Sequence, residues 1–283
     1  MVDLHVHTTR SDGALTPTQA VRYAAARGLR AVAVTDHDTI DGNEEASAAG
    51  RAAGVDVVAG VEISTQWDGI TFHLLGYGLK RVTPRVREAF AFLVESRCRR
   101  NPEMLEKLRR LGIDLTMEEV AAEARGEIVG RPHFAQALVR RGVVGSTQEA
   151  FARFLGRGAP AYVDKNRLSP AQACELIREA RGLAVLAHPG LIEQDRPGAL
   201  HPLVEHLEGL GLAGIEAYYS RHSADQVSRY RSLARRKGLL VTGGSDFHRS
   251  GEGGPEMGTG FGDLRVPDSC YEELVARLGA PSR

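Results

Sequence analysis

The sequence predicts an α/β fold in which helices alternate with parallel strands, and two features of the chain indicate it. Short apolar runs, such as AVAVT at 31–35 and LAVLA at 183–187, alternate with segments of helical pattern. Polar residues that can carry chemistry stand at the ends of these runs, as in TDHDT at 35–39 and GSDFH at 244–248. Functional sites of parallel sheets and barrels lie at the carboxyl ends of the strands, so we expect these residues to meet.

Capping residues mark the predicted helices. The helix over AVRYAAAR (20–27) follows a threonine N-cap, a first-turn proline and a capping-box glutamine, and Gly28 is the expected left-handed residue at its end. The same arrangement begins at Ser169 and ends at Gly182, after which the next strand runs into His188. A strand at 214–219, a helix at 223–237 and a strand at 239–246 continue the alternation.

Residues 81–160 interrupt this alternation, because no strand signal of comparable strength lies there. A long helical pattern rich in Arg and Leu, with an expected interruption at Asn101 and Pro102, is followed by shorter helical segments. We therefore predict a discontinuous barrel domain over 1–80 and 161–283 and a helical insertion domain over 81–160. The GRPH segment (130–133) is the part of the insertion most expected to reach the site.

Composition excludes several classes of protein. The 36 basic and 36 acidic residues cancel, so there is no global field to attract nucleic acid, and an anionic ligand would need a local site. The three cysteines form no paired motif, which argues against a disulfide framework and a structural zinc knuckle. No stretch approaches the length of a membrane span and no leader pattern begins the chain. We expect a cytoplasmic protein with no membrane association and no obligate protein partner.

The opening run DLHVHTTRSDG (3–13) places two histidines two residues apart on a predicted strand. His5 and His7 then point the same way, and Leu4 and Val6 face the opposite side. Taken alone the pair has a simpler explanation, because a histidine in a strand is more often a core or surface residue. Imidazoles and carboxylates without thiolates, however, suit Mn, Fe or Zn in catalytic rather than structural roles.

Four segments in this order, DLHVHTTRSDG, TDHD, AHPG and GSDFH, resemble the polymerase and histidinol phosphatase (PHP) family of metal-dependent phosphoesterases. GRPH and IEAYYSRHS further resemble its free-standing subgroup, which acts on nucleotides and short RNA ends. The resemblance covers about 1–80 and 160–283. It implies a distorted (β/α)7 barrel with a helical insertion, and a site that holds two or three divalent ions, manganese first, with iron or zinc as alternatives.

The resemblance also implies the metal ligands. The first ion would take His5, His7, Glu62 and Asp246. The second would share Glu62 and take His73 and His188, and the third would take Asp12, His37 and His248. Many relatives have a histidine at the position of Asp12, so the third ion depends on that residue.

The expected chemistry is hydrolysis by a hydroxide that bridges two ions, with Asp246 in the catalytic set. His222 is the expected proton donor to the leaving oxygen and a phosphate contact. Arg131 and His133, at a helix start, are the other expected phosphate-binding residues. For His222 and Arg131 the alternative is a local capping or pairing role.

Three functions are compatible with these residues. The first is a phosphoric-ester hydrolase, a phosphatase or exonuclease, acting on a 3',5'-bisphosphate nucleotide or a short 5'-phosphorylated RNA. The second is a small-metabolite phosphatase such as histidinol phosphatase. The third is a non-catalytic binding module, against which stands the presence of every expected ligand. Against the second stand the helical insertion and the GRPH segment.

Overall fold

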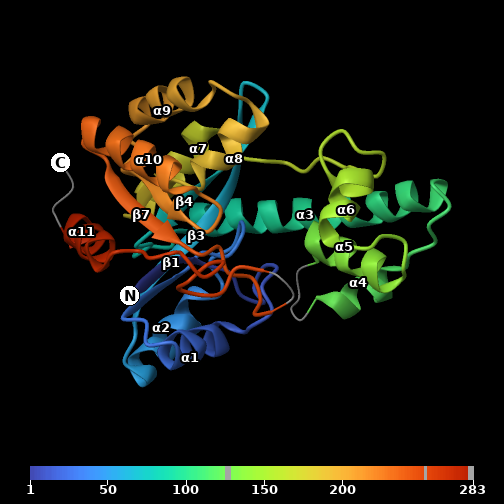
Figure 1. The fold of residues 1–283 in the computed structure, drawn as a ribbon, viewed down its shortest axis with the longest axis horizontal. Coiled ribbons are helices and arrows are strands. Elements are labelled where there is room, and N and C mark those ends of the chain that lie inside the picture. The colour runs from blue at the N-terminus through green and yellow to red at the C-terminus, as the bar shows by residue number, and fades with distance from the viewer. Residues whose placement is uncertain (125–128, 252–253, 280–283) are drawn as a thin grey trace.

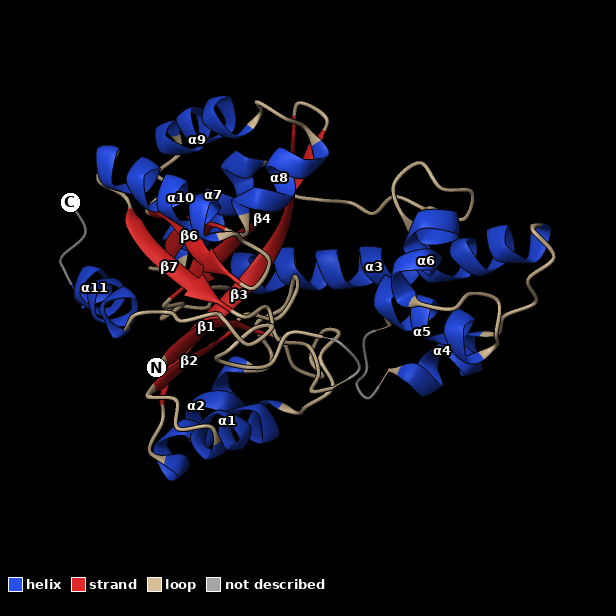
Figure 2. Cartoon of the chain, viewed as in Figure 1, coloured by secondary structure: helices blue, strands red, loops and turns tan. Residues whose placement is uncertain are grey.

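The seven strands of the computed structural model form one nearly closed, twisted sheet in sequence order (Figures 1 and 2). The structure describes residues 1–124, 129–251 and 254–279. The strands are β1 (Val2–Val6), β2 (Ala31–Val34), β3 (Asp56–Trp67), β4 (Ile70–Tyr77), β5 (Leu183–Leu186), β6 (Gly214–Tyr219) and β7 (Leu240–Gly244). The backbone just beyond β7 returns to β1, where the His7 N–H donates to the Phe247 carbonyl at 2.9 Å. The predicted distorted (β/α)7 barrel is confirmed.

The distortion comes from β4, which runs antiparallel to both of its neighbours, β3 and β5. The other strand pairs are parallel. β3 and β4 are joined by a tight turn at Asp68 and Gly69, whose φ values are 46° and 72°. Two consecutive residues with positive φ are what a two-residue hairpin with the twist of the flanking strands requires.

The helices of the barrel domain lie outside the sheet and cover it (Figure 2). They are α1 (Pro17–Ala26), α2 (Asn43–Ala53), α7 (Pro170–Glu179), α8 (Pro189–Asp195), α9 (Leu200–Gly209), α10 (Ala224–Arg236) and α11 (Asp268–Gly279). The predicted capping boxes at α1 and α7 are present, and Gly28 has the expected positive φ of 71°. At the end of α7 the left-handed residue is Arg181 and not Gly182, because the turn closes one residue earlier. No described helix is long and apolar enough to span a bilayer.

The insertion is helical, as predicted. It comprises α3 (Pro84–Arg110), α4 (Met117–Glu123), α5 (Arg131–Arg140), α6 (Thr147–Ala150) and the π-helix η1 (Phe151–Leu155). The expected interruption of α3 at Asn101 and Pro102 is wrong, because the helix continues through both residues. The missing N–H of Pro102 costs stability, but buried Asn101 donates to the Val129 carbonyl at 2.9 Å and Met104 is fully buried. Tertiary packing therefore outweighs the local preference.

The long helix α3 joins the barrel to the insertion, as Figure 1 shows. Val86, Phe90 and Leu93 in its first half belong to the hydrophobic core of the barrel. Met104 and Leu108 in its second half belong to a separate core that includes residues of α5 and the π-helix. Because α3 contributes to both cores, the division of the chain at residues 80 and 160 stays a prediction.

Candidate metal centre

The barrel brings the histidines and carboxylates of the strand ends together at one end of the sheet. The nine residues predicted as metal ligands surround one site, and they are His5, His7, Asp12, His37, Glu62, His73, His188, Asp246 and His248. His5, Glu62 and His73 lie on strands, and the others follow strand ends. This position follows from the rule that parallel strands present functional residues at their carboxyl ends.

Glu62 is the centre of this site. Its Oε1 atom lies 2.7 Å from His73 Nδ1 and 2.9 Å from His188 Nε2. Its Oε2 atom lies 2.8 Å from His37 Nδ1 and 3.3 Å from His7 Nε2. Burial raises the pKa of this carboxyl, but the surrounding histidines outweigh burial and hold the pKa well below its usual range. Glu62 is therefore an anion shared by several imidazoles, which is the arrangement of a bridging ligand.

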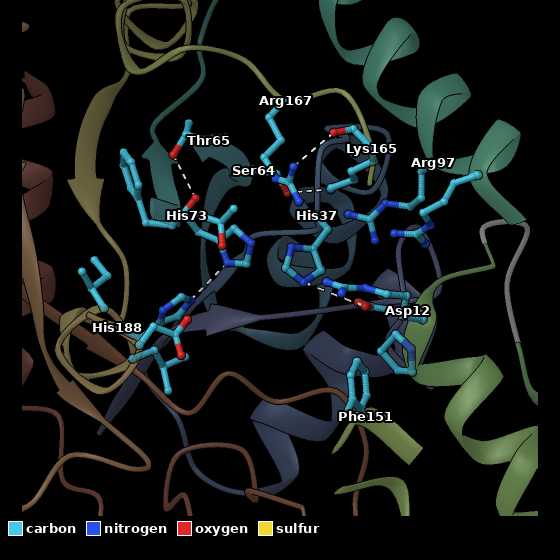
Figure 3. Close-up of a pocket in the computed structure, with 18 residues that line it drawn as sticks. Asp12, His37, Ser64, Thr65, His73, Arg97, Phe151, Lys165, Arg167 and His188 are labelled. Carbon is cyan, nitrogen blue, oxygen red and sulfur yellow. Dashed lines mark hydrogen bonds and ion pairs between the residues drawn. The ribbon is translucent and has the colours of Figure 1, made fainter. Parts of the chain in front are cut away.

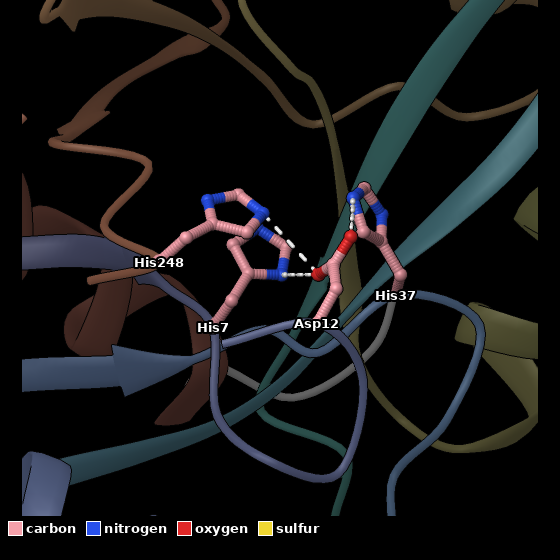
Figure 4. Close-up of side chains that lie close together, drawn as sticks. All are labelled: His7, Asp12, His37 and His248. Atoms are coloured by element: carbon pink, nitrogen blue, oxygen red, sulfur yellow. Dashed lines mark ion pairs between the residues drawn. The ribbon is translucent and has the colours of Figure 1, made fainter. Parts of the chain in front are cut away.

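Three groups of side chains have ligand atoms close enough to hold an ion each. In each group these atoms lie within 4.8 Å of one another. The groups are His5, His7, Glu62 and Asp246; His7, Asp12, His37 and His248; and His37, Glu62 and His73. Figure 4 shows the second, in which His37 and His248 face the carboxylate of Asp12. The first group is the set predicted for the first ion, and the second adds His7 to the set predicted for the third.

Several buried polar atoms of the site have no hydrogen-bond partner. Among the described residues they include His5 Nε2, both ring nitrogens of His7, Asp12 Oδ1, His37 Nδ1 and Glu62 Oε2. A buried polar atom without a partner is rare and destabilising, because it has lost its hydrogen bonds to water and gained none in the protein. Imidazole nitrogens and carboxylate oxygens that converge without hydrogen-bond partners fit a divalent cation, and this ligand set fits Mn, Fe or Zn.

A further carboxylate, Glu216 of β6, contacts two of the candidate ligands on the side away from the site, and sequence reasoning did not identify it. Its Oε1 atom lies 2.9 Å from His5 Nδ1, and its Oε2 atom accepts from the His188 N–H at 2.7 Å. It is fully buried. The one signal in the sequence is a glutamate inside the otherwise apolar run GIEAYY.

Asp36 fixes the loop that follows β1. It accepts hydrogen bonds from the Thr8 N–H at 2.7 Å, from Thr8 Oγ1 at 2.6 Å and from Ser11 Oγ at 2.6 Å. The loop carries His7 and Asp12, so these bonds hold two candidate ligands in place.

The backbone is strained at the same edge of the barrel. His188 and Asp246 have φ values of 27° and 57°, and Asp38 has 59°. Left-handed backbone in a residue other than glycine costs of order 1–3 kcal/mol and persists where the surroundings enforce it. Here it directs the side chains of His188 and Asp246 into the site.

A cationic cleft of about 260 Å³ opens beside the metal centre, between the barrel and the insertion (Figure 3). Candidate ligands, including His37, His73 and His188, line this cleft together with several cations, which are Arg97, Arg100, Arg131, Lys165 and Arg167. Sequence reasoning did not single out Arg97, Arg100 or Arg167. Arg97 and Arg100 lie three residues apart on α3, and both are 5% exposed. The available signal in the sequence was this spacing, which places the two charged residues on one face of the helix.

Two of these cations lack an acidic partner within the described chain. Asp38 pairs with both Arg97 and Lys165, and Asp164 pairs with Arg167. Neither Arg100 nor Arg131 has a carboxylate within ion-pair distance in that same part of the chain. Burial, with help from Arg97 and Arg131, lowers the pKa of Arg100 to about 9. A buried guanidinium without a carboxylate partner is suited to bind an anionic ligand, because the ligand compensates its charge.

Arg131 lies in this cleft at the start of α5, as its predicted role requires. Its guanidinium donates to the Leu155 carbonyl at 3.3 Å and lies over the rings of Phe151 and Tyr162. His133 instead caps α5, with Nδ1 accepting the Gly130 N–H at 3.0 Å, and burial lowers its pKa. Their roles toward phosphate stay predictions.

His222 lies outside the cationic cleft, on the other side of α8. Its Nδ1 lies 2.9 Å from the Ala217 carbonyl, and its Nε2 accepts the Gly190 N–H at 3.1 Å. Since a carbonyl can only accept, the ring is neutral with its proton on Nδ1. Both nitrogens are thus engaged by backbone, and the proton-donor role of His222 stays a prediction.

Known proteins resemble this chain along most of its length. A 3',5'-nucleoside bisphosphate phosphatase of Chromobacterium violaceum is 35% identical over 292 residues, with 99% of each chain covered. A 5'-3' exoribonuclease of Haemophilus influenzae is 35% identical over 247 residues, covering 87% of this chain and 89% of that one. A solved structure of an amidohydrolase from Chromobacterium violaceum, with bound sulfate, superposes with a TM-score of 0.88 at 35% identity, covering 98% and 96% of the two chains.

The family model described as the PHP domain matches residues 3–156, more than half of the chain. The two relatives of this chain named above are a phosphatase and an exoribonuclease, which are both phosphoric-ester hydrolases. The clustered histidines and carboxylates supply the ligands that metal dependence requires. The chain therefore belongs to the PHP family and is a metal-dependent phosphoesterase.

Proposed function

We propose that the protein hydrolyses a phosphate ester of a nucleotide that carries a second phosphate, either a nucleoside 3',5'-bisphosphate or a short 5'-phosphorylated RNA. One observation carries this proposal. The metal centre adjoins a cleft in which Arg100 and Arg131 have no carboxylate partner in the described chain, so a second phosphate has a site of its own. The relatives named as a nucleotide phosphatase and an exoribonuclease support it.

The nine clustered residues, with Glu62 shared, would hold two or three divalent ions. Manganese is our first expectation, with iron or zinc as alternatives. Bound ions would activate the attacking water and stabilise the charge on the phosphoryl oxygens. Asp246 holds its place in this set because the Tyr219 hydroxyl donates to its Oδ2 at 3.1 Å, leaving Oδ1 directed at His5 and His7.

Arg131 and Arg100 would bind the second phosphate and so fix the position of the ester to be cleaved. Arg131 is pre-positioned, since Phe151 and Tyr162 flank its guanidinium. A planar guanidinium held in this way can offer two parallel N–H donors to phosphate.

The leaving O3' needs a proton. His222 remains our candidate from the sequence, and Lys165 is a second one. Lys165 lines the cationic cleft itself, and burial together with Arg97 lowers its pKa to about 7. A group that loses its proton near neutral pH can both give and regain it there.

The two other functions are less well supported. A small metabolite with a single phosphate, such as histidinol phosphate, would leave the unpaired cations of the cleft without an anion. A non-catalytic module would have no need for the complete set of ligand atoms around Glu62.

The test is a comparison of substrates with the manganese-loaded protein. We expect kcat/KM for a nucleoside 3',5'-bisphosphate to exceed that for the matched 3'-monophosphate by at least about tenfold, the worth of one charge-assisted phosphate contact. Histidinol phosphate should be a poorer substrate than either. Equal rates for the two nucleotides, or preferred turnover of histidinol phosphate, would contradict the proposal.

A further inference from the structure

A second cleft, of about 400 Å³, lies beside the metal centre and is separate from the cationic one. Helix α8 divides the two, because His188, Ile192 and Asp195 line the cationic cleft whereas Gly190, Glu193 and Gln194 line the other. Leu191 borders both. The two clefts therefore lie on different sides of α8.

The second cleft reaches the metal ligands through Tyr219. This tyrosine lines the cleft, its hydroxyl donates to Asp246 Oδ2 at 3.1 Å, and its ring centroid lies 5.4 Å from that of His188. A group bound against Tyr219 would thus be next to the candidate ligand Asp246.

In the described part of the chain, the wall beside Tyr219 is formed by polar groups and the cation Arg221. Arg221, His222 and Gln226 line it, together with Gln194. Among the described lining residues the acidic one is Glu193, which already accepts a hydrogen bond from the Tyr230 hydroxyl at 2.6 Å and lies 3.5 Å from Arg229. Arg221 can therefore bind an anionic group of a ligand in this cleft.

An aromatic ring lies under this cation. The Arg221 guanidinium is 5.6 Å from the ring centroid of Phe261, and Phe261 is 50% exposed. A half-exposed ring beside an arginine is the combination with which proteins bind single-stranded nucleic acid, the ring stacking a base and the arginine meeting a phosphate.

The chemistry of RNA cleavage needs such a second site. When water attacks the phosphate between the first and second nucleotides, a P–O bond forms to the water oxygen, the P–O3' bond breaks and O3' takes a proton. The first nucleotide leaves with its 5'-phosphate, and the phosphoryl group stays esterified to O5' of the second nucleotide. If the first nucleotide occupies the cationic cleft, the second must lie elsewhere around the metals.

We propose that the second cleft, with Arg221 on its wall and the Phe261 ring against Arg221, binds the nucleotide on the 3' side of the scissile phosphate. The protein then removes nucleotides one at a time from the 5' end of a short 5'-phosphorylated RNA, and each shortened product carries the 5'-phosphate that the cationic cleft binds next. This inference rests on the proposed function and specifies RNA as the substrate among the two that were proposed. A free bisphosphate ends at the scissile phosphate and has no group to place in this cleft.

The test uses the full-length manganese-loaded protein and two substrates, a 5'-phosphorylated tetraribonucleotide and a nucleoside 3',5'-bisphosphate. For Arg221→Ala and Phe261→Ala, kcat/KM on the RNA should fall by about tenfold or more, mainly through KM, and kcat/KM on the bisphosphate should change by less than about twofold. Phe261→Tyr keeps an aromatic face and should retain most of the activity on RNA. Melting temperatures confirm that the variants fold.

Arg231→Ala is the matched control. Its guanidinium also lies 5.6 Å from an aromatic ring, that of Tyr218, but it does not line the second cleft. Both activities should be unchanged in it. The inference is overturned if the Arg221 and Phe261 variants lose both activities equally or neither, or if the wild type cleaves the bisphosphate and not the RNA. If the wild type cleaves neither substrate, the proposed function fails as well.

Discussion

His5 Nδ1 lies 2.9 Å from Oε1 of Glu216, and both side chains are completely buried. Burial lowers the pKa of His5, but Glu216, Glu62 and Asp246 outweigh it and raise the pKa well above its usual value in the metal-free protein. The contact holds the proton on Nδ1 and directs Nε2 toward Glu62 and Asp246, each 3.5 Å away. A carboxylate behind a histidine in this way sets the tautomer and raises the basicity of the metal-facing nitrogen.

Replacing Glu216 by glutamine should therefore weaken metal binding. An amide keeps the size of the side chain but removes the charge that supports His5, and outer carboxylates of this kind are worth about 10- to 100-fold in metal affinity. Titration with manganese measures the change. Glu205→Gln, at an exposed position on α9, is the control and should bind metal as the wild type does. Unaltered affinity in Glu216→Gln would leave this residue a purely structural role.

Asp12 decides whether a third ion is held. Its Oδ1 lies 3.2 Å from His248 Nε2 and its Oδ2 lies 3.9 Å from His37 Nε2, in a side chain that is 5% exposed. Asp12→Asn removes the carboxylate charge of that group but none from the groups around Glu62. We expect elemental analysis to find one ion fewer per chain, with the remaining ions retained. An unchanged metal content would show that His7, His37 and His248 do not need Asp12.

Arg131→Ala should raise KM for a nucleoside 3',5'-bisphosphate by about tenfold or more, because one charge-assisted contact to phosphate is lost. Metal content should be unaltered, since Arg131 contacts the Leu155 carbonyl and aromatic rings and no candidate ligand. The KM of the matched 3'-monophosphate should hardly move. Arg141→Ala, at the exposed end of the same helix, serves as control. The same KM in wild type and Arg131→Ala would assign Arg131 to local packing alone.

The metal-free protein should lose stability as pH rises from neutral to alkaline. Burial lowers the pKa of His7, but the carboxylates of Asp246 and Glu62, 3.1 and 3.3 Å from its Nε2, outweigh burial and raise the pKa to about 10. A folded-state pKa above the unfolded value of about 6.5 gives stabilisation that is complete below that value and is lost as pH approaches 10. Bound cations would replace the proton as partner of the two carboxylates.

Melting temperatures of chelator-treated and manganese-loaded protein between pH 6.5 and 10 measure this difference. The chelator-treated sample should show the steeper decline. Parallel curves would mean that the proton on His7 and the metal ions do not occupy the same site.

The barrel and the clustering of its histidines and carboxylates were predictable because most of these residues stand in or shortly after an apolar run. His188 follows LAVLA and Asp246 follows the β7 run, so the rule for parallel strands brings them together without knowledge of the loops. The strained backbone at both residues was not predictable, since it depends on packing between distant segments.

The cationic wall was predicted only in part. Arg131 stood out because it begins a helix next to a glycine, whereas Arg97 and Arg100 lie in the middle of a long helix rich in arginine. Only the path of α3 past the barrel decides which of its arginines face inward. Glu216 and the backbone bonds of His222 depend likewise on contacts between β6 and neighbouring segments, which no local pattern reveals.

The central claim is that Glu62 joins the metal ions that carry out phosphate-ester hydrolysis, and the variant Glu62→Gln tests it most directly. Metal content by elemental analysis and turnover of a nucleoside 3',5'-bisphosphate are measured on the same preparations of variant and wild type. We expect the variant to hold less metal and to lose turnover, because a neutral amide cannot replace a carboxylate in contact with several imidazoles. A folded Glu62→Gln variant that keeps both its metal and its activity would contradict the account.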